Sequence, residues 1–357
     1  MRVYIKFLIK KYLGSIFFVC GILISLIIIL NILGEIEFFK NIPVKQYYPI
    51  FLASINSPSL IFEMFPFIFL ISTQVFYLNL FKDDQIQIFK YSGLKNFQII
   101  KIITFTSFFL GILIITFFYN FSSNLKNYYL KLKFKHTADG KYLAVVTNNG
   151  LWIKDVINNG ISIVNSKKIE DNYLVETFIT QFDNNFNVIR NIKSNKIDVN
   201  KKEWVIYNAE IYQDGAYLKQ PEIIIYSNFD YTKIKNLFSN LSSLSLFELF
   251  ELKKNYQKLN YSTTEVNIEI HKILSFPIYL TLMTIISSIL MLSFKKIKGN
   301  SIKIIIGLFL SVIIYYINNF FYVMGNTEKL SVLNSIWSPL IFLTFLNFLL
   351  LIKINAK

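Results

Sequence analysis

The 357-residue sequence has one cysteine, Cys20, and two histidines, His136 and His271. One cysteine cannot form an intramolecular disulfide, and neither histidine has a partner at the spacing of a zinc site. The one Gly-Lys pair, Gly140-Lys141, is followed by a tyrosine, so there is no Walker phosphate loop, and no Gly-x-Ser-x-Gly nucleophile elbow is present. The chain is therefore predicted to bind no ATP through a Walker motif, to hold no metal or cofactor, and to have no hydrolase nucleophile of this kind.

Acidic residues are also scarce, with 22 against 37 lysines and arginines and a net charge of +15. A basic chain could bind nucleic acid, but many of these lysines flank long apolar runs, where they act as topology signals and headgroup anchors. The chain is 54% hydrophobic, and its apolar residues are grouped into blocks. Since backbone groups in hydrocarbon need internal partners, each block is predicted to be a transmembrane helix, and no nucleic-acid partner is predicted.

Six apolar blocks are long enough to cross about 30 Å of hydrocarbon. Lysines precede the first block, occupy the link at 82–98 and follow the fourth block, while the turn between the fifth and sixth blocks is not lysine-rich. The positive-inside rule then places both chain ends and the link at 82–98 in the cytoplasm. Pro58 and Pro66 are expected near the entry of the second block. The blocks cover residues 13–33, 57–81, 99–119, 273–294, 304–324 and 332–352.

A polar insertion of domain size, residues 120–272, separates the third block from the fourth. Short β-branched and aromatic runs alternate there with turn signals such as Asn158-Asn159-Gly160, which suits a tight hairpin. The insertion is predicted to be an all-β, jellyroll-like domain on the outer side, between transmembrane regions 1–119 and 273–357. A short amphipathic helix is predicted at 243–256. The predicted strands include residues 142–146, 151–153, 161–164 and 203–207.

The cytoplasmic link at 82–98 is amphipathic. A short helix here could dock into the groove of a partner protein, and a glycine near its end would let the backbone turn sharply before the third block. An ordinary loop lying on lipid headgroups would have the same pattern, so both interpretations stay open. The residues of interest in this link are Asp83, Asp84, Gln85, Ile86, Phe89, Ser92 and Gly93.

Several short motifs occur in the same order as in one known family. They are the basic start Arg-Val-Tyr-Ile at 2–5, Asn-Ile-Leu-Gly-Glu-Ile-Glu at 31–37, Glu-x-x-Pro at 63–66, Lys-Tyr-Ser-Gly at 90–93 and Gly-Leu-Trp-Ile-Lys-Asp at 150–155. Together with the layout of three helices, a β domain and three helices, they resemble the lipopolysaccharide export permeases of the LptF/LptG family. The acidic exit of the first block and the Gly-Leu-Trp motif resemble LptG more than LptF.

The resemblance implies an ABC transporter permease of the bacterial inner membrane that extracts lipopolysaccharide. It would pair with the paralogous permease (LptF, if this chain is LptG), be driven by a dimer of the ATPase LptB, and pass the lipid through LptC to the LptA bridge. Residues 82–98 would form the coupling segment that contacts the ATPase. Where the family usually has glutamate in this segment, the chain has Gln85, so Asp84 is the expected substitute and a glutamate at position 85 is expected to be tolerated.

Basic residues next to the predicted outer ends of the first and third blocks could contact the lipid's phosphates. The resemblance implies that Lys40 and Lys126 lie near the family's phosphate-contacting positions, and Lys131 is a further candidate. Lysines at such positions also extend toward headgroups as simple anchors, and this alternative is equally open for each one.

Three other kinds of membrane protein could combine membrane spans with an outer domain. A membrane sensor with a periplasmic ligand-binding β domain would normally carry a large cytoplasmic output domain, and no inner link here exceeds about 20 residues. A membrane-embedded lipid enzyme would need ionisable residues clustered within its spans, and the predicted spans contain almost none. A permease of the lipoprotein-release or efflux kind would be expected to have four spans with its outer domain after the first.

Overall fold

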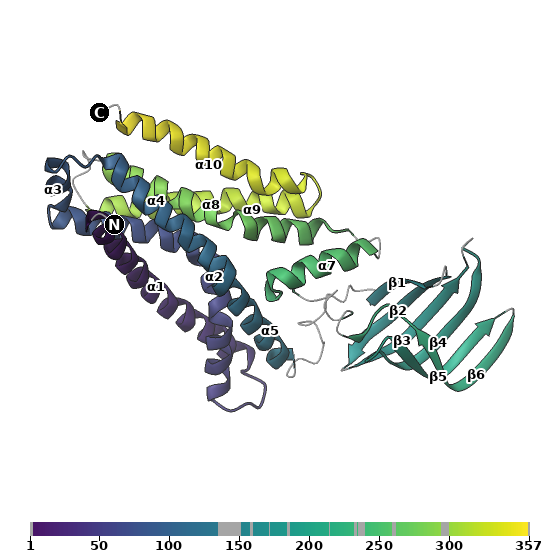
Figure 1. Ribbon diagram of the computed structural model, residues 1–357. Coiled ribbons are helices and arrows are strands. Elements are labelled where there is room, and N and C mark those ends of the chain that lie inside the picture. Colours follow the sequence, from purple (N-terminus) through teal and green to yellow (C-terminus); the bar gives the residue numbers. More distant parts are fainter. Residues whose placement is uncertain are drawn as a thin grey trace. The chain divides into compact units, whose positions relative to one another are not determined.

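The structure is a computed structural model that describes residues 3–134, 151–157, 160–170, 172–183, 186–213, 215–231, 234, 240–258, 262–293 and 300–355. The chain divides into two compact units, one made of Met1–Lys126 with Thr264–Lys357 and the other of Asn127–Thr263. Figure 1 shows the helices of the first unit and the sheet of the second.

Helices α1 to α5 and α8 to α10 contain six candidate membrane spans, as the six apolar blocks predict. A π-helical turn joins α4 to α5, so that residues Asn96–Lys133 form one continuous span. The elements are α1 (Val3–Phe38), α2 (Tyr47–Lys82), α3 (Gln85–Tyr91), α4 (Asn96–Leu113), the π-helical η1 (Ile114–Tyr119), α5 (Asn120–Phe134), α8 (Thr264–Ser293), α9 (Asn300–Asn326) and α10 (Val332–Asn355).

The helices are longer than the apolar blocks that predict them. Helix α2 begins at Tyr47, so Pro58 and Pro66 lie inside the helix rather than at its entry. Transmembrane helices tolerate such prolines because side chains and neighbouring helices satisfy the freed carbonyls. Helix α8 begins at Thr264, before the apolar block at 273, because its first turns carry charged residues that hydropathy alone does not include.

Helices α2 and α8 form the centre of the first unit. The most apolar part of each is 67% buried, against 11% for α1 and 17% for α9. Gly111 of α4 lies against Pro277 of α8, where an added Cβ would come within 2.7 Å of the proline Cα. Small residues permit such close helix packing in membranes.

A buried hydroxyl cluster connects four helices of this unit. The Tyr12 hydroxyl of α1 lies 2.7 Å from Ser107 Oγ of α4 and 3.2 Å from Thr284 Oγ1 of α8. Thr73 of α2 lies 3.4 Å from the same hydroxyl. Since an unpaired polar group in hydrocarbon is costly, these mutual hydrogen bonds hold α1 in a defined position near its start.

The second unit contains a six-stranded antiparallel sheet in the sequential order β1-β2-β3-β4-β5-β6. This confirms an inserted β domain, and the sequential order refines the predicted jellyroll-like arrangement. The predicted strand at 142–146 lies outside the described residues. The strands are β1 (Leu151–Ile157), β2 (Gly160–Glu170), β3 (Tyr173–Phe182), β4 (Val188–Asp198), β5 (Glu203–Gln213) and β6 (Ala216–Tyr226).

The sheet curls so that the segment after β6 meets β1. The buried Asp155 carboxylate of β1 accepts hydrogen bonds from Ser227 Oγ at 2.7 Å and from the Asn228 backbone and side-chain nitrogens. Regular pairing is interrupted at Glu176 and Asn208, both at positive φ. At the interruption near Asn208, the Ser194 hydroxyl of β4 lies within hydrogen-bonding distance of two backbone carbonyls, one in β4 and one in β5. Such irregularities bend a strand and increase its twist.

Among the described residues after the sheet are the helices η2 (Leu241–Ser243) and α7 (Leu246–Lys258). Helix α7 lies where the amphipathic pattern predicts a helix. Its first turn has a capping arrangement in which Glu248 accepts from the Ser245 backbone nitrogen at 2.7 Å and the Ser245 hydroxyl accepts from the Glu248 nitrogen at 3.4 Å.

Candidate functional site

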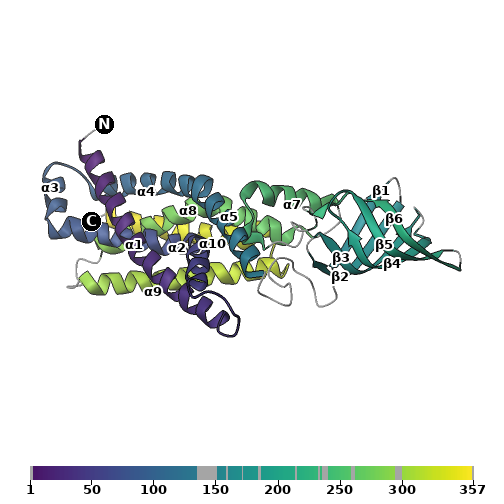
Figure 2. The same cartoon turned by 90° about the horizontal axis from the view of Figure 1, so that it is seen from below.

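The predicted coupling segment, residues 82–98, forms a short helix between two sharp turns. Helix α3 begins after Asp84, at φ 52°, and is followed by Gly93, at φ 80°. Asp is among the residues that tolerate the left-handed region, and Gly adopts it without steric cost. In Figures 1 and 2 the first turn of α1, helix α3 and the last turn of α10 lie at the same end of the first unit.

The two faces of α3 are occupied differently. Ile86 is 5% exposed, and the Phe89 ring meets Phe7 of α1 edge-on with 6.0 Å between ring centroids. In contrast, Ile88 is 59% exposed and Tyr91 is 88% exposed. The apolar surface that the segment presents outward is therefore formed by Ile88 and Tyr91, while Ile86 packs inside the unit.

A groove of about 680 Å³ runs between α3 and the start of α1. Ser92 and Gly93, both predicted site residues, lie in its wall. Its apolar lining comes from both elements: Val3, Tyr4 and Phe7 of α1, and Ile88, Phe89 and Leu94 of the coupling segment.

Three polar side chains form a closed triangle beside this groove. Lys11 Nζ of α1 donates to Asp83 Oδ2 at 2.8 Å and to Gln85 Oε1 at 2.9 Å. Gln85 Nε2 in turn donates to Asp83 Oδ2 at 3.0 Å. The Asp84 side chain is exposed, and no hydrogen bond or ion pair to its carboxylate is found within the described part of the chain. Asp83 and Gln85 are thus turned toward Lys11, and Asp84 is left facing outward.

A second group of charges, the outer cluster, consists of Glu269, Lys272 and Tyr322. Lys272 Nζ lies 3.2 Å from Glu269 Oε1 and 5.2 Å from the centre of the Tyr322 ring, whose hydroxyl donates to Glu269 Oε2 at 3.3 Å. The buried Glu269 carboxylate is therefore paired, as a charge inside a membrane protein requires. The sequence reasoning missed this cluster, although a Glu and a Lys three residues apart before an apolar block could have signalled it.

The predicted lipid-binding lysines are placed differently from one another. Lys126, at the end of the first unit's part of α5, lies within electrostatic range of Glu63, Glu269 and Lys272. Lys40 is exposed in the turn after α1, and Lys131 is exposed on the part of α5 that belongs to the second unit. Of the three, Lys126 is the one that the structure brings to the outer cluster.

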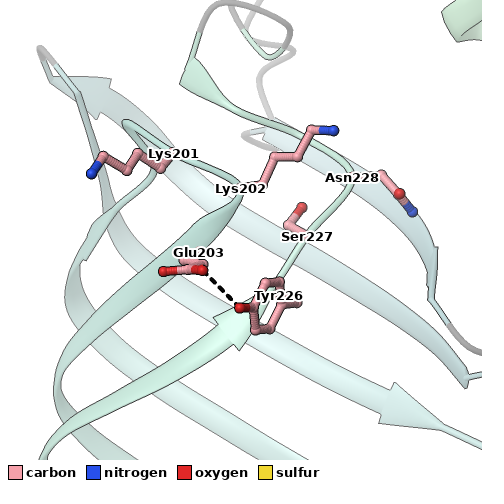
Figure 3. A pocket seen from close by; sticks show the side chains of 6 residues that line it. All are labelled: Lys201, Lys202, Glu203, Tyr226, Ser227 and Asn228. Atoms are coloured by element: carbon pink, nitrogen blue, oxygen red, sulfur yellow. Dashed lines mark hydrogen bonds between the residues drawn. The ribbon is translucent and has the colours of Figure 1, made fainter.

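The second unit has a pocket of about 520 Å³ beside the turn between β4 and β5. Figure 3 shows that the side chains of Lys201 and Lys202 point away from each other, so their ammonium groups do not converge on one anion. The Tyr226 hydroxyl donates to Glu203 Oε1 at 2.7 Å, and this hydrogen bond raises the pKa of the Tyr226 phenol. Across the described ranges no group of three or more His, Cys, Asp or Glu side chains could hold a metal ion.

Comparison with protein families gives one match of nearly full length. Residues 6–353 match the family described as lipopolysaccharide export system permease LptF/LptG. The match covers both transmembrane regions and the β insertion. Comparison with curated protein sequences gives no match.

Proposed function

Because the chain belongs to the LptF/LptG family of lipopolysaccharide export permeases, we propose that it is the membrane subunit of an ABC transporter that extracts lipopolysaccharide from the inner membrane. The lipid would then pass to a periplasmic bridge toward the outer membrane. The observation that carries this proposal is the family match across residues 6–353, which agrees with six spans flanking a β domain. The acidic stretch at 31–37 favours LptG, with LptF as its partner permease.

The proposed orientation places α3 and both chain ends in the cytoplasm and the β domain in the periplasm. The lysine distribution supports it through the positive-inside rule. The common location of the start of α1, helix α3 and the end of α10 is consistent with it, since three elements that must face one compartment lie at one end of the unit.

Energy for extraction has to enter through a protein contact. Removing acyl chains from a bilayer costs about 0.8 kcal/mol per methylene, and the sequence has no Walker motif of its own. We assign this contact to the coupling segment. Its outward surface offers an apolar patch at Ile88 and Tyr91 and one carboxylate, Asp84, which would meet a basic group of the LptB dimer.

The lipid path would need cationic groups for the phosphates of lipopolysaccharide. Lys126 is the best placed of the predicted lysines, because it lies beside the outer cluster. Glu63 and Glu269 offset part of its charge, which would favour reversible rather than permanent binding of a phosphate. Lys40 and Lys131 remain candidates on their position in the chain.

Co-purification tests the proposal. The tagged chain, expressed in the bacterium that encodes it, should retain the paralogous permease and the ATPase, and a photo-crosslinker near Lys126 should capture lipopolysaccharide. Retention of an ATPase together with a crosslinked lipoprotein would support a lipoprotein-release permease instead. A chain that retains no ATPase and captures no lipid would contradict a transport role and favour a sensor.

A further inference from the structure

The Lys11 triangle joins the coupling segment to a transmembrane helix that lies elsewhere in the sequence. Lys11 belongs to α1, whereas Asp83 and Gln85 flank the start of α3. One turn earlier on α1, Phe7 packs against Phe89 of α3, and Lys11 Nζ lies 5.5 Å from the centre of the Phe7 ring. A polar contact and an aromatic contact thus connect the same two elements side by side.

We propose that Lys11 is a positioning residue that makes α1 and the coupling segment one mechanical element. This inference rests on the proposed function, in which the ATPase moves the coupling segment. Movement of α3 would then reach α1 directly through Lys11, and would not have to pass through α2 and α4, the helices that the segment connects. The inference also gives Asp83 and Gln85 an internal role and leaves Asp84 for the ATPase.

The burial of α1 explains why this connection would matter. Near its start α1 is fixed by the fully buried Leu8 and by the Tyr12 hydroxyl cluster. Further along, large side chains such as Phe18 and Leu30 are about 60% exposed, at 62% and 60%. Asn31 also connects α1 to α2 further along, with its amide donating to a backbone carbonyl of that helix at 2.8 Å. A displacement of the start of α1 would therefore shift its exposed surface while α1 keeps its contact with α2.

The chemistry at position 85 fits this role specifically. A glutamine can accept from Lys11 with its carbonyl oxygen and donate to Asp83 with its amide nitrogen, which closes the triangle. A glutamate at this position would lose the donor and bring a second carboxylate beside Asp83. The sequence alone predicts that a glutamate at position 85 is tolerated. The hydrogen bonds of Gln85 predict instead that this glutamate disrupts the triangle.

The test uses the complete complex, with partner permease and ATPase, in nanodiscs that contain lipopolysaccharide. The readout is lipid released per ATP hydrolysed, which a merely structural role would not change in complexes that assemble normally. Lys11→Asp and Asp83→Lys should each lower this ratio severalfold, and the double variant should restore it because the ion pair is re-formed in reverse. Lys10→Asp, the same charge change at the neighbouring exposed lysine, should leave the ratio near wild type.

A second measurement reads the contact itself. In a Cys20→Ala background, cysteines at positions 7 and 89 are joined by a short thiol crosslinker with and without ATP. The crosslinking yield should be the same with and without ATP when the Lys11 triangle is intact. In Lys11→Asp the yield should differ between the two conditions. Gln85→Glu should also make the crosslinking yield depend on nucleotide. Adding Asp83→Asn to Gln85→Glu should make the yield independent of nucleotide again.

Two outcomes would overturn the inference. One is a Lys11→Asp complex with a normal ratio and a nucleotide-independent yield. The other is a double variant that assembles but stays as uncoupled as the single variants. A wild-type complex that retains no ATPase would instead overturn the proposed function. The total crosslinking yield of positions 7 and 89 would then still show whether Lys11 holds the two elements together, because it should be lower in Lys11→Asp than in wild type.

Discussion

Asp84 is the carboxylate of the coupling segment that faces outward, because Lys11 holds Asp83 and Gln85. Asp84→Lys should therefore repel the basic group of the ATPase that we expect at this site, and lower both ATPase retention and lipid-stimulated hydrolysis. Gln87→Lys is the matched control, since it adds a lysine at an exposed position of the same helix and keeps Asp84. Pull-down and hydrolysis assays measure both effects. Normal values in Asp84→Lys would mean that the ATPase contact is apolar, through Ile88 and Tyr91.

Lys126 is the residue whose role in lipid binding can be tested most directly. Lys126→Gln removes its charge without adding a carboxylate beside Glu63 and Glu269. Since hydrogen bonds to charged groups contribute about 1.5–3 kcal/mol, we expect a clear loss of photo-crosslinking to lipopolysaccharide, and a further loss with Lys40→Glu. Lys45→Glu, in the same exposed turn as Lys40, serves as the control. Unchanged crosslinking in an assembled Lys40→Glu, Lys126→Gln complex would assign both lysines to membrane anchoring.

The sequence points to Asp83, Asp84 and Gln85 as candidate contact residues of the coupling segment, but it does not predict which of them face the inside of the unit and which face outward. Asp83, Asp84 and Gln85 are adjacent polar residues, and no local pattern distinguishes them. Their separate roles depend on Lys11, more than 70 positions earlier in the chain. Contacts of this kind are set by how α1 packs against the coupling segment, and hydropathy contains no information about that.

At the scale of helices and strands, apolar runs predicted which segments span the membrane and polar alternation predicted the β insertion. The helix ends were less predictable. Charged turns such as the one holding Glu269 and Lys272 continue α8 beyond its apolar block, because a paired charge can be buried where an isolated one cannot. The bend of the sheet could not be predicted from the sequence. The left-handed backbone at Glu176 and Asn208 follows from pairing across several strands and not from local residue preference.

The contact between α4 and α8 gives a prediction at this scale. In Gly111→Ala the new methyl group would lie 2.7 Å from Pro277 Cα and 2.9 Å from its Cβ, closer than real contacts allow. The two helices would have to separate, and overpacking of this kind costs about 1–3 kcal/mol. We expect a lower melting temperature of the detergent-purified protein, followed by thiol-reactive dye at Cys20. Gly14→Ala, where no atom lies within 4 Å of the added Cβ, is the control and should melt like wild type.

At the scale of the whole molecule, the direction of transport depends on which side of the membrane each unit faces. Three candidate spans precede the β unit and three follow it, and six crossings in this order would put the β unit on the side opposite to both chain ends. The lysines around the coupling segment support the proposed cytoplasmic location of that segment, where ATP is available. A permease with this arrangement can receive energy at α3 and deliver lipid toward its β unit. The inverted arrangement would separate the ATPase from its contact.

Single cysteines in a Cys20→Ala background test this arrangement at three exposed positions. Gln87→Cys lies on α3, Asn200→Cys in the turn between β4 and β5, and Lys329→Cys in the turn between α9 and α10. A membrane-impermeant maleimide should label positions 200 and 329 in intact spheroplasts, and position 87 only after permeabilisation. Labelling of position 87 alone from outside would show that the orientation is the reverse of the proposed one. Labelling of all three would contradict the six-span arrangement, because three spans separate α3 from the turn that holds Lys329. An odd number of crossings cannot return the chain to the same side.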